Sequence, residues 1–469
     1  MMGQKKFTMK QYHHLSLDDL VSPNDLYRKI DEAIDFSFIY YLAKEAYSHT
    51  GQPSLDPVVF FKVELVGFLE GIHEDRALER RVKDSLAIRW FLGYDLDEPL
   101  PVHSTISRTR KDRISQALYQ AVFDHILGIC IRHQLVQGHH QSIDSTLLKA
   151  NASLDSLEAL QPKVLAHYEK AVGANASESK HEDSEPPSES IPSTKPMRRD
   201  PEAKVAKKPG FPGAAYYKAS ASVDEAYGVI THAQVDDANK NDAELLKAVV
   251  SRAKERLSSR GLGLQSVGAD QGFYSTENLK FLEEEKLIGY LPPRLQRNHI
   301  QGYHQNQFRY DHQKDVFICP EGKILEFKQY HSQYPHLKKY RARPKDCRIC
   351  SQRVSCTVGQ VRSIQISVHE NLIQTAIQRC QSEAGRIAML LRKTQSEGTF
   401  AHLKEVLKFR KLYSLGLESA GKRFLMACAA INLKKLIQVS DILCHFFRNL
   451  AFFFKERAKL RAVSGFVYA

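Results

Sequence analysis

The stretch Val267–Tyr274, which reads VGADQGFY, decides the fold of this chain. An apolar run from Leu262 leads into Gly268-Ala269-Asp270, and Ser275-Thr276-Glu277 then has the composition of a helix start. The pattern predicts a buried strand that carries one carboxylate, Asp270, at its C-terminal end beside a glycine-bearing turn. Open α/β sheets build their sites at such strand ends.

Two further acids match this one. Asp144 lies in a second apolar stretch, Ser142–Thr146, and Glu397 lies in a long basic helical segment. Phosphodiester chemistry often uses two metal ions about 3.5–4 Å apart, and Mg²⁺ prefers carboxylate ligands. The three acids therefore predict a site for two Mg²⁺ or Mn²⁺ ions. Each acid alone is better explained as a turn residue or a helix cap, so the prediction depends on all three.

The order of elements indicates how two of these acids meet. Strands are expected at Gln141–Lys149, Tyr216–Val223, Gly228–Val235, the Asp270 stretch and Leu287–Leu291, with helices at Asp242–Leu257 and Glu277–Glu285. This order predicts a ribonuclease-H-like mixed α/β sheet, antiparallel at first and then parallel with crossover helices. The first and fourth strands are neighbours in that layout, so Asp144 and Asp270 should lie close together.

The rest of the chain divides around this core. Residues 1–135 read as an all-α domain, in which Ser54-Leu55-Asp56-Pro57 caps a helix. The catalytic core occupies residues 136–295, with a disordered insertion at 173–210 that has almost no apolar residues. Residues 296–365 form a cysteine-containing insertion, and residues 366–469 form a helical remainder of the core that carries Glu397.

Composition narrows the class of protein. The chain has 469 residues, a formal charge of +13 and no secretory signal at its start. A basic balance favours a polyanion as partner, although a solvated basic surface is the alternative. No stretch approaches the roughly 18 apolar residues that span a bilayer, and eight cysteines in this length do not make a disulfide scaffold. These features predict a cytoplasmic protein without a membrane partner.

Two basic segments are candidates for DNA contact. The predicted helix Ser104–Arg113 carries Arg108, Arg110 and Lys111 within three turns. In the second segment, Lys393, Glu397 and Lys404 stand at i, i+4 and i+11 and so share one face of a regular helix. The alternatives are a solvated basic helix for the first and an exposed ion pair for the second.

Four cysteines fall within one insertion. Cys347 and Cys350 have the spacing of a zinc knuckle, and Cys319 and Cys356 lie on either side of them. The five-residue gap before Cys356 is not a standard knuckle. A structural zinc ion and reduced, part-buried thiols therefore remain alternatives.

The chain resembles the DDE transposases of bacterial insertion sequences, in the branch whose last acid lies in a Tyr-x2-Arg-x3-Glu-x6-Lys signature. The corresponding positions are Leu390, Lys393, Glu397 and Lys404, so tyrosine and arginine are replaced here. Further similar stretches are SLDPVVFFK (Ser54–Lys62), RALER (Arg76–Arg80), RWFLGYDL (Arg89–Leu96), LPVHSTISRTRKDRI (Leu100–Ile114), SIDSTLLKANAS (Ser142–Ser153) and VGADQGFYS.

The resemblance implies Mg²⁺-dependent cutting and joining of DNA by Asp144, Asp270 and Glu397. One metal ion would activate the water that frees a 3′-OH at the element's end, and that 3′-OH would attack the target DNA. The partners implied are the element's terminal inverted repeats, the target DNA and at least one more copy of the chain. Two alternatives stay open: a ribonuclease-H-like nuclease without strand transfer, and an inactive DNA-binding remnant.

Overall fold

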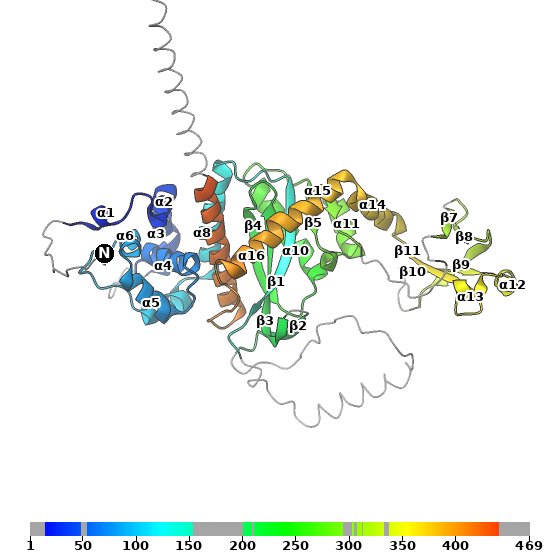
Figure 1. Cartoon of the computed structure of the whole chain (residues 1–469), viewed down its shortest axis with the longest axis horizontal. Coiled ribbons are helices and arrows are strands. Elements are labelled where there is room, and N and C mark those ends of the chain that lie inside the picture. The colour runs from blue at the N-terminus through cyan, green and yellow to red at the C-terminus, as the bar shows by residue number, and fades with distance from the viewer. Residues whose placement is uncertain are drawn as a thin grey trace, which may run out of the picture. The chain divides into compact units, whose positions relative to one another are not determined.

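The computed structural model describes residues 15–47, 54–152, 200–208, 211–293, 303, 307–311, 313–332 and 337–439 (Figure 1). The chain forms two compact units. The first comprises Met1–Gln265 and Leu390–Ala469, and the second comprises Ser266–Met389. The core of the fold is a mixed α/β sheet with helical segments, as predicted.

The described N-terminal residues of the first unit are helical, as the sequence predicts. The helices are α1 (Leu17–Leu20), α2 (Leu26–Ala33), α3 (Phe38–Ala43), η1 (Lys44–Ala46), α4 (Pro57–Leu69), α5 (Asp75–Asp84), α6 (Leu86–Leu92), α7 (His103–Arg108), η2 (Thr109–Arg113) and α8 (Gln116–Arg132). Asp56 caps α4 by accepting from the N–H groups of Val58 and Val59, which confirms the predicted cap. Among the described helices none alone is long and apolar enough to cross a membrane; α7–η2 and α8 pass that test only as a pair bent by 98°.

The sheet of the first unit is built around β3 (Phe211–Asp224). It pairs antiparallel with β1 (His140–Lys149) along one side, and along the other with β2 (Lys204–Lys208) and β4 (Ile230–Asp237). The register sets Asp144 opposite Ala221. The predicted antiparallel strands are therefore confirmed. The strand β2 was not predicted.

The prediction of a disordered insertion at 173–210 is wrong for its last part. Residues 204–208 form β2, and Ala206 is buried. The chain just before β2 is fixed by Asp200, whose carboxylate accepts hydrogen bonds from the Tyr217 hydroxyl at 2.6 Å and the Gly416 N–H at 3.3 Å. Tyr217 and Gly416 lie elsewhere in the chain. A prediction based on the low hydrophobicity of the local sequence could not include their contribution. Residues 173–199 lie outside the described part.

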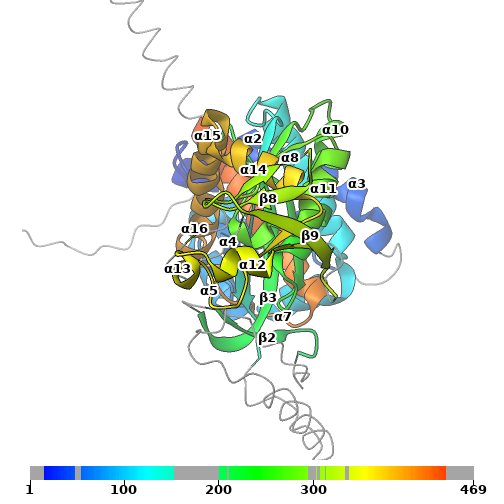
Figure 2. The same ribbon diagram turned by 90° about the vertical axis from the view of Figure 1, so that its right-hand side faces the viewer.

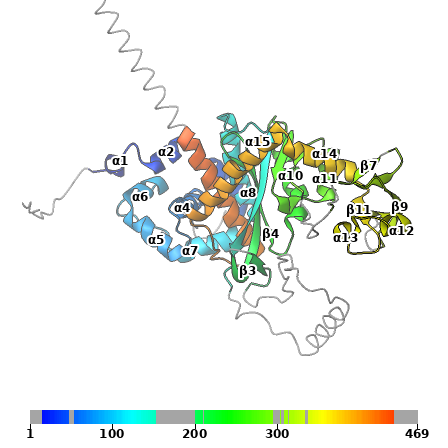
Figure 3. The same cartoon turned by 45° about the vertical axis from the view of Figure 1, so that its right-hand side comes forward.

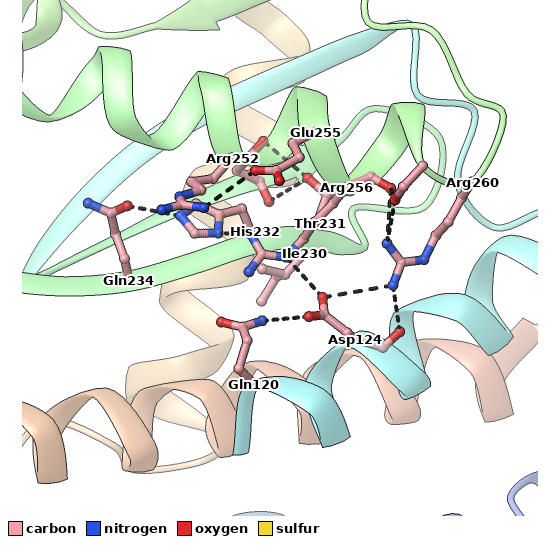
Figure 4. Close-up of polar contacts among 12 residues, drawn as sticks. Gln120, Asp124, Ile230, Thr231, His232, Gln234, Arg252, Glu255, Arg256 and Arg260 are labelled. Atoms are coloured by element: carbon pink, nitrogen blue, oxygen red, sulfur yellow. Dashed lines mark hydrogen bonds and ion pairs between the residues drawn. The ribbon is translucent and has the colours of Figure 1, made fainter. Parts of the chain in front are cut away.

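Helices on the sheet join its strands to the N-terminal helices. Helix α10 (Asp242–Ser258) packs on β1, β3 and β4. Its Arg256 bonds Asp124 of α8 at 2.9 Å and Nδ1 of the buried His232 on β4 at 2.5 Å (Figure 4). A helix over residues 417–439 supplies Asn432, whose side-chain amide bonds both the N–H and the C=O of Ile230 at 2.8 Å. Asn432 thereby takes the place of a strand partner at the start of β4.

The second unit begins with the Asp270 strand. β5 (Ser266–Ala269) pairs parallel with β6 (Ile288–Tyr290), as predicted, and α11 (Thr276–Glu284) connects them. Helix α14 (Glu370–Gln381) packs on α11 and β6 and leads into α15 (Glu383–Leu391), whose last two residues fall in the first unit (Figure 3).

The second unit also contains a small antiparallel sheet. Its order is β11-β10-β9-β8-β7, from β7 (Arg309–Asp311), β8 (Val316–Ile318), β9 (Ile324–Tyr330), β10 (Leu337–Ala342) and β11 (Ser363–Ser367). Short helices α12 (Pro344–Arg348) and α13 (Arg353–Cys356) lie beside it (Figure 2). This sheet has its own buried cluster: Phe308, Phe317, Leu325, Tyr340, Ala342, Ile364 and Ile366.

Candidate active site

Asp144 lies in the middle of β1. The residues on either side of the Asp144-Ser145 pair are buried, whereas the Asp144 side chain keeps 15% of its surface exposed. Its Oδ1 accepts a hydrogen bond from the Ser145 N–H at 2.8 Å, and the Ser145 hydroxyl donates to Asp242 of α10 at 2.6 Å. The carboxylate is thus held by a rigid strand and remains open to solvent on one side.

Glu397 ends a π-helical turn, η6 (Arg392–Glu397), which separates α15 from α16 (Gly398–Glu405). Such wide turns are rare within helices and are frequent at functional sites. The regular-helix arithmetic that set Lys393, Glu397 and Lys404 on one face therefore does not hold across this segment. The Glu397 side chain is 46% exposed.

The π-helical turn is anchored against the sheet. It packs on β1 and β3, and the chain after α16 returns to β1, where Lys149 donates to the Arg410 carbonyl at 3.1 Å and accepts from the Leu412 N–H at 2.8 Å. Gln395 approaches the β3–β4 turn so closely that a Cβ on Gly228 would lie 2.4 Å from its Oε1. Gly228 also has φ +67°, a conformation that favours glycine. Glu397 is therefore held at a defined place over β1.

Arg392 brings Asp144 and Glu397 together. Its Nη2 lies 2.5 Å from Glu397 Oε1, and its Nη1 lies 3.8 Å from Asp144 Oδ2. The side chain is only 17% exposed, so both ion pairs are partly shielded from water. One cation therefore stands between two of the three predicted catalytic acids. Arg392 was not among the residues predicted from the sequence; the signal available there was its position five residues before Glu397, beside the basic residue Lys393.

Asp270 follows β5 directly, as predicted. It is half-buried and caps the short helix η4 (Gln271–Phe273), and its Oδ1 accepts from the Gly272 N–H at 2.8 Å. This cap accounts for one carboxylate oxygen and leaves the other for further partners. Asp270 belongs to the second unit, and its meeting with Asp144 and Glu397 stays a prediction.

The residues predicted to contact DNA differ in their exposure to solvent. Arg108, Lys111 and Lys393 are exposed, and Lys404 is half-buried. Arg110, in contrast, is 7% exposed and bonds the buried Glu64 at 2.6 Å and Asp75 at 2.7 Å. The assignment of Arg110 to DNA is wrong, because its guanidinium is consumed by ion pairs inside the helical domain. The predicted helix Ser104–Arg113 is also α7 followed by the π-helical turn η2, which turns Arg110 inward.

The four cysteines of the insertion lie around one cavity of the small sheet. Cys319, Cys347, Cys350 and Cys356 all line it, and each is half-buried with a free thiol. Within the described ranges, no three histidine, cysteine, aspartate or glutamate side chains stand in positions that would hold a metal ion. The same is true of the predicted catalytic acids, where Arg392 lies between Asp144 and Glu397.

Two family models match the chain. Residues 15–112 match a model described as "Transposase domain (DUF772)", and residues 318–437 match one described as "Transposase DDE domain". The second match includes Arg392 and Glu397. A comparison with curated proteins gave no match.

Two solved transposase structures are distantly similar to the chain. A piggyBac transposase synaptic complex with hairpin DNA aligns over 88% of this chain and 72% of its own, with 10% identity and a TM-score of 0.32. A Mos1 transposase paired-end complex with the left transposon end aligns over 53% and 62%, with 9% identity and a TM-score of 0.17. These TM-scores are too low to support a conclusion about the fold or the function of this chain. The two matched domains, which cover the described chain from α1 through α7 and the Glu397 segment, support a DDE transposase.

Proposed function

We propose that this protein is the transposase of a bacterial insertion sequence. It binds the terminal inverted repeats, cuts the DNA there and joins the freed 3′ ends to target DNA. It acts in the cytoplasm, on nucleoid DNA, as a dimer or higher assembly that holds two ends. The catalytic acids are Asp144, Asp270 and Glu397 on a ribonuclease-H-like core.

The observation that carries this proposal is the convergence of Asp144 and Glu397 on Arg392. The two carboxylates come from a strand and a helix that are far apart in the sequence, and both lie against the same cation. A structural ion pair needs only one acid. Two acids at one partly exposed position are what a divalent cation requires, and the match to a transposase DDE domain supports the same function.

The carboxylates suit Mg²⁺ or Mn²⁺ in their chemistry, since both ions prefer oxygen ligands. A metal ion bound there supplies polarisation of the phosphodiester and activation of the attacking oxygen. Asp144 and Glu397 would hold such ions once Arg392 has moved aside. We include Asp270 because it directly follows a strand end, where a fixed carboxylate is expected. The stretch VGADQGFYS around it also resembles the corresponding stretch of the insertion-sequence transposases.

The chain's own cations then position the DNA. Arg392, once displaced, would donate to a phosphate oxygen, for which its planar guanidinium is well suited. Lys393, Lys404, Arg108 and Lys111 would contact the backbone without reading sequence. The net charge of +13 favours such binding through counterion release.

The experiment is excision and joining on the DNA that flanks the gene, with Mg²⁺ and with Mn²⁺, followed on sequencing gels. Asp144→Ala, Asp270→Ala and Glu397→Gln should abolish cutting, whereas Glu405→Gln, at an exposed acid of α16, should not.

Cutting with joined products in the parent alone would establish the proposal. Cutting without joining would identify a nuclease instead. Tight DNA binding with neither activity would identify an inactive remnant. Activity in the Asp270→Ala protein equal to that of the parent would contradict the assignment of the acids.

A further inference from the structure

The small sheet of the second unit has a small apolar core. Seven residues form its buried cluster, and its strands β7 and β8 have only three residues each. Segments of this size usually need a disulfide, a metal ion or an assembly partner in addition to their apolar core. Cys319, Cys347 and Cys356 pack against this cluster, which places candidate staples at the required position.

The four cysteines reach one cavity from three separate places in the chain. Cys319 directly follows β8, Cys347 and Cys350 lie in and just after α12, and Cys356 ends α13. All four line the same cavity of the second unit. Four thiols converging from separate segments are not what packing alone requires, because any small apolar residue would fill the same space.

The backbone around these residues is already shaped. At Cys319 the chain makes a tight turn, in which Gly322 donates to the Cys319 carbonyl at 2.8 Å, and the Lys323 N–H points at the Cys319 sulfur at 3.2 Å. Cys350 donates to the Cys347 carbonyl at 3.3 Å, so the Cys-x2-Cys segment is also a closed turn.

We propose that Cys319, Cys347, Cys350 and Cys356 bind one structural Zn²⁺ ion. Tetrahedral coordination by four thiolates is the usual form of a closed zinc site. The sulfurs do not stand in ligand positions now, but each can turn about its one side-chain torsion, and the cavity they line provides the space. The ion would draw them together and staple α12 and α13 to β8.

The test is made on the full chain, purified under reducing conditions without a chelator. Elemental analysis should find about one zinc per chain, and refilling with Co²⁺ should produce the visible d–d bands of tetrahedral thiolate coordination. The variant Cys347→Ser/Cys350→Ser should lose the ion and the bands. Cys380→Ser is the matched control, because Cys380 is a half-buried thiol of the same unit that does not line the cavity.

A second measurement does not depend on any variant folding. Alkylation followed by peptide mass analysis should show the four cavity thiols protected in the metal-loaded parent and reactive after chelation, with Cys380 unchanged. A reduced parent that takes up neither Zn²⁺ nor Co²⁺ would overturn the proposal. So would disulfides among the four, or metal retained by the double variant. None of these readouts uses DNA cleavage, so this proposal and the proposed function fail separately.

Discussion

Removing one buried carboxylate should weaken the packing of the helical domain on the rest of its unit and lower the free energy of unfolding. Glu64 of α4 is fully buried, and its carboxylate accepts from Arg110 at 2.6 and 3.0 Å and from Arg423 at 2.7 Å. Burial alone would raise the pKa of Glu64, but the two guanidinium groups hold it below its ordinary value. The group is therefore a buried anion between two buried cations, one from η2 and one from the helix over residues 417–439.

Glu64→Gln keeps the size of the side chain and removes its charge. Arg110 retains Asp75 as a partner, whereas the remaining contacts of the Arg423 guanidinium with described residues are His73, at 3.4 Å, and the face of Phe68. Breaking a buried ion pair by removing one partner costs about 3–5 kcal/mol. Because Asp75 still compensates Arg110, we expect the low end of that range, a loss of about 3 kcal/mol in the free energy of unfolding.

Urea unfolding followed by circular dichroism measures this loss, and hydrogen exchange of the α4 and α8 amides shows where it acts. Glu405→Gln, which removes an exposed ion pair with Arg410, is the control and should cost less than about 1 kcal/mol. Arg423→Met should recover part of the loss in the Glu64→Gln protein, because it removes the uncompensated charge. A loss below 1 kcal/mol for Glu64→Gln, or additive losses in the double variant, would refute this reasoning.

Four further outcomes are expected. Arg392→Gln should tighten Mn²⁺ binding at least tenfold in calorimetry, about 1.4 kcal/mol, because its guanidinium competes for Asp144 and Glu397; Lys393→Gln should leave it unchanged. Stability should fall by about 2 kcal/mol between pH 7 and pH 5 for each buried neutral histidine such as His232. Its pKa is lowered to about 3 by burial and by Arg256, so the unfolded chain binds more protons as the pH falls through 6.5; a flat urea midpoint would contradict this. Asn432→Leu leaves the N–H and C=O of Ile230 without the amide and should cost about 2–4 kcal/mol, with faster hydrogen exchange at Ile230. Arg108→Ala/Lys111→Ala should reduce the slope of log DNA affinity against log salt concentration by the equivalent of up to about two phosphate contacts. The melting temperature should not change. An unaltered slope would show that this helix does not contact the DNA.

Local patterns were enough for most of the secondary structure. Apolar alternation and turn residues located β1, β3 and β4, and the Asp56-Pro57 pair located the start of α4, because strand and helix periodicity and capping act within a few residues. Asp144, Asp270 and Glu397 could be named for a similar reason. Each stands at a recognisable place in its own element, and the residues around it resemble stretches of a known family.

Contacts between remote segments decided the rest. Local sequence made Arg110 a surface cation, but Glu64 and Asp75, which bury it, lie in other helices. Residues 204–208 seemed too polar to be ordered, and β3 supplied the backbone partners that order them.

The sequence by itself located most of the strands and helices and named three acids as candidates, and two of its stretches match transposase domain models. Only the tertiary structure decided which charges neutralise one another, because ion pairing depends on distance in space and on burial. Arg392 is the clearest example. Nothing near it in the sequence sets it beside Asp144, yet the packing of the π-helical turn on β1 makes it the cation that any metal ion at these acids must displace.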